Sequence, residues 1–522
     1  MSMTRLCAPR WMVKRSRFWN MVGPVALLLN LDGQNLGLEV ASKTPIFARV
    51  AELISEEVRR GRLRPGARLP GTRPLAEQLG VGRNTVVAAY AELAAEGWIV
   101  TRPAGGSFVS SDVPERRARR FGKRTTEGAS ALSPGFDFEP RTLDRTYDAR
   151  PGTFELFGGT PDLRLFPTGL LARAYRRALH GVGRANLNYT GPFGHARLRA
   201  ALASMVSDTR ALSVATEQLI VTHGSQMAID LVARTLIRPG DRVAVEEIGY
   251  QSAWAALLQA GAELVYLPVD KQGLDVSALE AELTRGALRA VYLTPHHQYP
   301  TTAALSVGRR LRLLELAAKH RLIVIEDDYD HEFHYDGRPL ASLAGADRAG
   351  VVVYIGTLAK VLAPGLRLGF IAAPRSLIET LGAVRFHVDR HGDTVTECAV
   401  AELIEEGELA RHARRMRRAY HARRDALVGS LRKHLGSELS FDVPAGGMTL
   451  WAEADSNIDT RAWLTRSAKH QVAFTLGSSY VARELSPRKA RHYAQCLRLG
   501  FAQYTEKELE TAVKRMASAL RA

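Results

Sequence analysis

The stretch that decides the fold of most of this chain is residues 354–370, YIGTLAKVLAPGLRLGF. It follows the apolar run 351–353, which predicts a buried strand. A lysine, Lys360, stands in a turn after this strand, and a Pro-Gly break, Arg367 and a second apolar run follow it. Taken alone, a lysine in such a turn is most often an ordinary surface residue.

A second apolar run upstream changes this interpretation. Residues 322–329, LIVIEDDY, predict a buried strand that ends in carboxylates. An acid at the end of one strand and a lysine after the next are what pyridoxal 5'-phosphate requires, because this cofactor needs an amine for its imine and an acid for its ring nitrogen. We therefore predict that Lys360 forms the imine and that Asp327 holds the ring nitrogen. Tyr329, on the same side of the strand as Asp327, is expected to bond the phenolic oxygen.

Apolar runs alternate with helical segments from about residue 219 onward. This pattern predicts an α/β fold with a mainly parallel central sheet covered by helices on both faces. Ligands of such sheets bind beyond the carboxyl ends of the strands, where several more polar residues stand. Tyr250 is expected to stack on the cofactor ring. The expected phosphate ligands lie at a helix start or flank the lysine turn: Ser225, Gln226, Thr357 and Arg367.

A different pattern occupies residues 46–109. Apolar positions predict a helix over 46–58, a short helix around 74–79, a third helix that opens at Arg83, and a hairpin over 98–109. This order is that of a winged helix-turn-helix, whose second motif helix enters a DNA major groove. A three-helix bundle with a solvated basic face is the alternative.

Polar residues around the third helix are the expected contacts to double-stranded operator DNA. Arg83, Asn84 and Thr85 stand at its start, where side chains reach base edges. Arginines before the helix are expected to contact phosphates, and a glycine in the wing would let the backbone approach the duplex: Arg68, Arg73 and Gly105.

Composition sets the broad class. The chain has 522 residues and a net charge of +17, which predicts two or three domains and a polyanionic partner. Its three cysteines favour a reducing compartment, the cytoplasm, and their spacing predicts no metal site. The apolar run 22–29 is too short for a membrane span, and its Gly and Pro argue against a signal peptide.

These observations predict four segments. Residues 1–41 form a basic N-terminal extension, 42–111 the DNA-binding domain, 112–151 a flexible linker and 152–522 the cofactor-binding domain. The basic run 115–124 in the linker either adds non-specific DNA affinity or is merely solvated. For the seven arginines of residues 411–424 a solvated helix face is the default interpretation, and a DNA-contacting flank of a dimer is the alternative.

The motifs also resemble known families. Residues 63–70, LRPGARLP, and 79–86, LGVGRNTV, are similar to the GntR-type DNA-binding domain. The resemblance implies that Arg73, Arg83 and Gly105 touch DNA, although Val87 stands where members often carry a second basic residue. From about residue 152 the chain resembles the type I aminotransferase fold with a smaller C-terminal α+β subdomain.

Taken together, the predicted DNA-binding domain and the predicted cofactor-binding domain resemble the MocR family of transcription regulators. The matching motifs include residues 159–167, GTPDLRLFP, and 326–333, EDDYDHEF. The resemblance implies a domain-swapped homodimer in which Tyr189 reaches the neighbouring subunit's phosphate. It also implies that Arg498 pairs with an amino acid carboxylate. Three positions depart from the family pattern and bear on turnover more than on cofactor binding: Ala359, Thr302 and Ile248.

Three functions remain open on this pattern. The first is a regulator that senses an amino compound, or pyridoxal phosphate itself, through an imine to Lys360. The second is an active aminotransferase with a secondary DNA-binding head, so that enzymatic activity is not decided by the sequence. The third is a regulator whose large domain only dimerises. The joint presence of Lys360, Asp327 and Tyr329 argues against the third.

Overall fold

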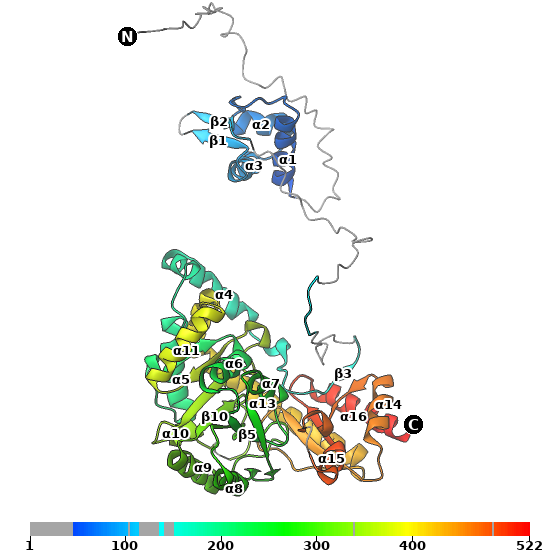
Figure 1. Ribbon diagram of the computed structural model, residues 1–522. Helices are drawn as coiled ribbons and strands as arrows, with labels where there is room; N and C mark the ends of the chain where they lie inside the picture. Colours follow the sequence, from blue (N-terminus) through cyan, green and yellow to red (C-terminus); the bar gives the residue numbers. More distant parts are fainter. Residues whose placement is uncertain (1–44, 103–104, 114–134, 140–150, 338–339, 483–484) are drawn as a thin grey trace, which may run out of the picture. The chain divides into compact units, whose positions relative to one another are not determined.

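The computed structural model describes residues 45–102, 105–113, 135–139, 151–337, 340–482 and 485–522. Contacts divide the chain into two compact units, residues 1–142 and 143–522 (Figure 1). The predicted N-terminal extension and most of the predicted linker, including its basic run, lie outside the described residues. Among the described helices, none combines the length and apolar character needed to cross a membrane.

The first unit is a three-helix domain with a hairpin. Its elements are α1 (Ile46–Arg59), α2 (Thr72–Leu79), α3 (Arg83–Ala95), β1 (Ile99–Arg102) and β2 (Gly106–Val109). One apolar cluster joins all three helices, with Ile54, Leu75 and Val86 among its fully buried members. The Tyr90 hydroxyl donates a hydrogen bond to the Pro70 carbonyl (2.7 Å) and so ties α3 to the segment before α2. The predicted winged helix-turn-helix is confirmed.

A seven-stranded sheet forms the centre of the second unit. Its strand order is β4-β12-β11-β10-β9-β5-β6. β12 is antiparallel to both neighbours and the other pairs are parallel, so the mainly parallel sheet predicted from the sequence is confirmed. The strands are β4 (Leu219–Thr222), β5 (Arg242–Glu246), β6 (Glu263–Leu267), β9 (Ala290–Leu293), β10 (Ile323–Asp328), β11 (Val352–Thr357) and β12 (Gly369–Ala372).

Helices cover both faces of this sheet (Figure 1). On one face α6 (Gly224–Leu236), α7 (Gln251–Gln259) and α11 (Arg375–Val388) share a core with Ile325 of β10. On the other face α8 (Val276–Arg285) and α9 (Val307–His320) share a core with Val324. Because side chains alternate along a strand, Asp327 emerges on the face of Ile325 and Asp328 on the opposite face.

The smaller C-terminal subdomain is built on an antiparallel sheet. Its strand order is β13 (Leu439–Ser440), β14 (Thr449–Ala454), β17 (Cys496–Gly500) and β16 (Thr475–Leu476). The long helix α13 (Glu408–Leu435) and α16 (Glu506–Arg521) pack together in its core. The short strand β3 (Phe154–Glu155) pairs with β15 (Val472–Ala473), so the beginning of the second unit is attached to this subdomain.

Two glycines allow the chain after β3 to approach the subdomain. Gly158 has a φ of +79°, and a Cβ there would lie 2.2 Å from Thr449 Cγ2. Gly159 follows with a φ of +76°. Any side chain at Gly158 would collide with β14, so this crossing requires glycine.

The arginine-rich helix α13 corrects one expectation. Arg423 and Arg424 are buried, and each is paired with a carboxylate: Arg423 Nη2 lies 2.9 Å from Asp162 Oδ2, and Arg424 Nη1 contacts Asp336. The solvated face expected for the whole run is therefore wrong for these two residues. The other five arginines of the run, Arg411, Arg414, Arg415, Arg417 and Arg418, are exposed.

Candidate cofactor site and DNA-binding head

Lys360 lies in the turn that follows β11, at the edge where the parallel strands end. Its Nζ donates a hydrogen bond to the carbonyl of Gly159 (2.7 Å). Burial, together with the nearby Arg498 charge, lowers the pKa of Lys360 to about 8. A buried lysine with a lowered pKa is a better nucleophile near neutral pH, because more of it is unprotonated.

Asp327 stands near the end of β10, on the next strand of the sheet. Its Oδ2 accepts a hydrogen bond from the Tyr292 hydroxyl (2.7 Å), whereas its Oδ1 is buried without a hydrogen-bond partner in the described part of the chain. Burial raises the pKa of Asp327 to about 7, and the Lys360 charge opposes this rise. The charges of Lys360 and Asp327 therefore affect one another in the folded chain.

Tyr292 is a site residue that the sequence pattern did not reveal. It lies on β9, opposite Ile325 of β10, so its side chain shares a sheet face with Asp327. The one feature of the sequence that could have indicated it is a polar hydroxyl in an otherwise apolar strand. A tyrosine in such a strand is, however, usually part of the core. The cross-strand hydrogen bond shows that this hydroxyl orients the Asp327 carboxylate.

Replacing Tyr292 with phenylalanine is expected to weaken the binding of pyridoxal phosphate roughly 3- to 10-fold. A typical net hydrogen bond contributes about 1 kcal/mol, and each 1.4 kcal/mol is a factor of ten. The measurement is a titration of the cofactor-free protein followed by absorbance. Tyr504→Phe is the matched control, because it removes a hydroxyl bonded to the Glu155 amide in the small subdomain. Equal dissociation constants for wild type and Tyr292→Phe would contradict the orienting role.

The expected phosphate side lies at the start of α6. Gly224 opens this helix with a φ of +78°, and the Arg367 guanidinium lies 3.2 Å from where its Cβ would be. Arg367 Nη2 also donates to the His223 carbonyl (3.0 Å). Ser225 belongs to the same first turn, and a Cβ on Gly369 would lie 3.0 Å from its amide nitrogen.

Two further predicted phosphate ligands border this turn. Thr357 is paired with Gly369 across β11 and β12, and its Oγ1 accepts a hydrogen bond from the Ala359 amide (3.1 Å). Gln226 donates to the Ser252 carbonyl (3.0 Å), and its Oε1 is buried without a partner among the described residues. Amides at a helix start, a hydroxyl and an arginine are groups that bind a phosphate.

Aromatic rings line the side next to Lys360. Tyr250 precedes α7, and its ring meets that of Tyr299 edge to face at 5.4 Å. Tyr299, which the sequence prediction also missed, contacts the Tyr329 ring at 6.0 Å. The Arg498 guanidinium lies 4.5 Å above Tyr299, and its Nη1 donates to the Phe157 carbonyl (2.7 Å). Tyr250, Tyr329 and Arg498 therefore all lie around the ring of Tyr299.

Tyr189 makes none of these contacts in the described part of the chain. The residue is 79% exposed, and its ring lies against Arg390 and His391.

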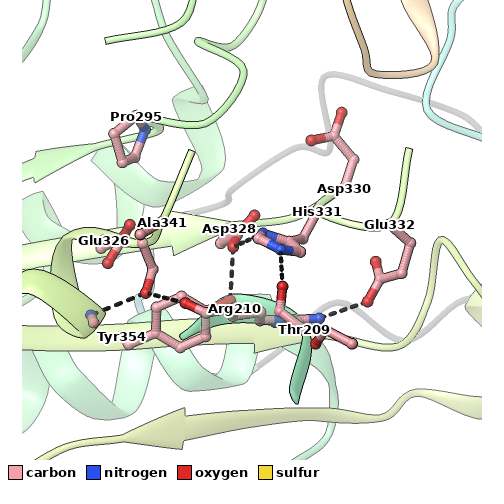
Figure 2. Close-up of polar contacts among 12 residues, drawn as sticks. Thr209, Arg210, Pro295, Glu326, Asp328, Asp330, His331, Glu332, Ala341 and Tyr354 are labelled. Atoms are coloured by element: carbon pink, nitrogen blue, oxygen red, sulfur yellow. Dashed lines mark hydrogen bonds and ion pairs between the residues drawn. The ribbon is translucent and has the colours of Figure 1, made fainter. Parts of the chain in front are cut away.

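The opposite face of β10 is fixed by a buried polar network (Figure 2). The Tyr354 hydroxyl donates to Asp328 Oδ2 (2.7 Å), which His331 Nδ1 also approaches at 2.9 Å. Arg210 contacts Tyr354 and pairs with Glu332 (2.6 Å). Burial acts to raise the pKa of Asp328, but the His331 charge and hydrogen bond help to hold it well below its usual value. Asp328 Oδ2 is thus occupied, although Asp328 Oδ1, like Asp327 Oδ1, is buried without a hydrogen-bond partner among the described residues. Of the two carboxylates, Asp327 is the one that lies on the sheet face opposite to this network.

In the first unit, the predicted DNA contacts lie on α2, α3 and the hairpin. Arg83 and Asn84 are exposed in the first turn of α3, and Thr85 is half-buried. Arg73 is exposed on α2. Arg68 is exposed beside the hairpin, with its Nε 3.5 Å from where a Cβ on Gly106 would lie, and Gly105 occupies the turn.

Fold and site together define a class of protein, a winged helix-turn-helix head joined to a domain of the type I aminotransferase fold. The family model described as "Aminotransferase class I and II" matches residues 164–516, and the model "Bacterial regulatory proteins, gntR family" matches residues 47–109. The chain belongs to the aminotransferase class I and II family and, with its gntR-type head, to the MocR-type transcription regulators.

Individual relatives support the same membership. The chain is 36% identical to the "Probable rhizopine catabolism regulatory protein MocR" of Rhizobium meliloti, over 84% of this chain and 87% of that protein. It is 31% identical to the HTH-type transcriptional regulator TauR of Rhodobacter capsulatus, over 91% and 96%. The solved structure of LysN, an alpha-aminoadipate aminotransferase from Thermus thermophilus, matches with a TM-score of 0.65 and 30% identity over 71% of this chain and 92% of that chain.

The cofactor of this family, pyridoxal 5'-phosphate, fits the residues present. Among the described residues the buried Asp327 Oδ1 has no hydrogen-bond partner, and a protonated ring nitrogen would supply one. Lys360 offers the amine, and the start of α6 with Arg367 offers the phosphate ligands. When bound, the cofactor supplies an electron-withdrawing ring that can link covalently to amino compounds.

Proposed function

We propose that this protein is a cofactor-dependent transcription regulator that senses an amino compound at Lys360 and binds operator DNA through α3. The observation that carries the proposal is the set of cofactor-binding groups in the second unit of a chain whose first unit exposes Arg83 and Asn84 at the start of a recognition helix. The proposed cell compartment is the cytoplasm, where such a regulator meets DNA.

Each site residue has a role in this proposal. Lys360 binds the cofactor covalently, Asp327 holds its ring nitrogen, Tyr329 bonds the phenolic oxygen and Tyr250 packs on the ring. Ser225, Gln226, Thr357 and Arg367 hold the phosphate. Arg498 is buried with its Nε unpartnered among the described residues, and it recognises a carboxylate on the effector.

The proposal includes a homodimer in which Tyr189 completes the phosphate site of the neighbouring subunit. Its exposure supports this role, because a side chain that serves another subunit must be accessible. Several large apolar side chains that precede it in the sequence are exposed as well: Leu163, Leu165, Leu179 and Leu187. A second subunit that covers them would remove apolar surface from water.

The test measures operator affinity of the cofactor-loaded protein with and without amino compounds. A ligand shifts DNA binding only if it binds the two states with different affinities. We expect an effective amino acid to change the DNA dissociation constant about 5- to 150-fold, the usual range of allosteric coupling.

Two comparisons sharpen this experiment. Arg498→Gln should lose the response to amino acids while a primary amine without a carboxylate still acts. An unchanged operator affinity across amino acids and amines would refute the sensing role. Steady transfer of amino groups between paired substrates, at about 1 per second or faster, would instead favour an active aminotransferase.

A further inference from the structure

Three histidines gather beside the cofactor site without taking part in it. His296 and His297 follow β9, and His334 lies in the segment after β10. Each offers a ring nitrogen, and these three nitrogens lie within 4.8 Å of one another. All three side chains line a cavity of about 610 Å³, to which Trp451 and Tyr493 of the small subdomain also contribute.

The nitrogens of this group are available as ligands. His296 Nε2 and His334 Nδ1 are buried and have no hydrogen-bond partner in the described part of the chain. Leaving such a group unsatisfied costs about 1–3 kcal/mol.

His297 is oriented in the way that metal-binding histidines usually are. Its Nδ1 lies 2.7 Å from Asp330 Oδ1, and a carboxylate at this distance keeps the proton on Nδ1 and the lone pair on Nε2. A Cβ on Gly446 would lie 2.3 Å from Nε2, so glycine at this position keeps that nitrogen clear.

A neighbouring group of His296, Asp328 and His331 is excluded by its hydrogen bonds, although its atoms are equally close. Both ring nitrogens of His331 are engaged, Nδ1 with Asp328 (2.9 Å) and Nε2 with the Thr209 carbonyl (3.0 Å) (Figure 2). His331 therefore has no lone pair to offer, and its interaction with Asp328 belongs to the network that fixes β10.

We propose that His296, His297 and His334 bind a divalent transition-metal ion of the zinc class, with a further coordination position open to the cavity. Neutral imidazoles are preferred ligands of such ions, and three of them with one open position form a common zinc arrangement. These nitrogens lie within 4.8 Å of one another, and rotation of the side chains would bring them to the spacing that metal–nitrogen bonds of about 2.0–2.1 Å require. The sequence did not reveal this group because its members become neighbours only through the pairing of β9 with β10.

The test is equilibrium dialysis of the full-length, cofactor-loaded, tag-free protein against zinc chloride, followed by elemental analysis. We expect one equivalent of zinc per chain. His296→Gln and His334→Gln should each lower the affinity at least tenfold, and Asp330→Asn should lower it about 10- to 100-fold. His470→Gln is the matched control, because the half-buried His470 follows α14 (Thr460–Lys469), does not belong to the three-histidine group and should leave zinc binding unchanged.

Thermal unfolding and cofactor absorbance establish that each variant is folded. His334 is only half-buried, so His334→Gln decides the question if His296→Gln fails to fold. The proposal is wrong if wild type takes up no zinc at micromolar concentrations, or if His334→Gln binds as much zinc as the control. Because cofactor content is measured in the same samples, zinc held by the cofactor itself would appear equally in all variants and would also overturn the assignment.

Discussion

Lys360→Ala is expected to abolish the visible absorbance that arises when pyridoxal phosphate is linked to the protein. Lys360 is the amine that lies in the site with Asp327, and its Nζ is held by the Gly159 carbonyl at 2.7 Å. Without it the cofactor is retained only by phosphate contacts, Asp327 and ring packing, so dialysis should remove it. Spectra of the dialysed variant and wild type, with phosphate analysis of the released cofactor, measure the effect.

Lys319→Ala is the matched control for this experiment. Lys319 is exposed in the last turn of α9, and its loss should leave the spectrum unchanged. DNA binding by Lys360→Ala without any effector should be retained, because the DNA-binding head forms its own core. A Lys360→Ala protein that keeps the wild-type spectrum after dialysis would refute the assignment of this lysine.

Arg83→Ala should nearly abolish specific operator binding and leave cofactor content unchanged. Arg83 is exposed in the first turn of α3, where a recognition helix meets base edges. Losing an arginine contact to a base costs about 1–3 kcal/mol for each recognition helix, or roughly 5- to 150-fold in affinity. In a dimer that binds two half-sites the free-energy costs add. Fluorescence anisotropy with the DNA segment that wild type protects upstream of its own gene measures the loss.

Arg60→Ala controls for the change in net charge. Arg60 follows α1 and pairs with Glu56 at 3.1 Å, so its removal changes the same charge in the same unit without touching α3. We expect it to retain most operator affinity. Equal losses from Arg60→Ala and Arg83→Ala would mean that Arg83 contributes only general attraction to phosphates, and the proposed base contact would be wrong.

The sequence predicted those helices and strands that are marked by the pattern of residues within the element itself. α1, α3 and the hairpin follow from apolar spacing, and β10 and β11 follow from apolar runs that end in polar residues. Lys360 and Asp327 could be placed together because the carboxyl ends of neighbouring parallel strands meet at one edge of a sheet. Alternation along β10 then explains why Asp327, rather than Asp328, faces the lysine side.

What the sequence did not predict depends on contacts between distant segments. Tyr292 reaches Asp327 only through the register of β9 with β10. Arg423 is buried because Asp162, 261 residues away in the sequence, neutralises it. A local charge pattern cannot distinguish such an arginine from a solvated one, because the two differ only in their tertiary partner.

The pairing of β3 with β15 has a mechanical consequence. Through this pairing, and through the close approach of Gly158 to Thr449, the start of the second unit is attached to the subdomain that carries Arg498. A displacement of that subdomain around a captured effector would carry β3 with it. The start of the second unit would then follow the subdomain rather than the seven-stranded sheet.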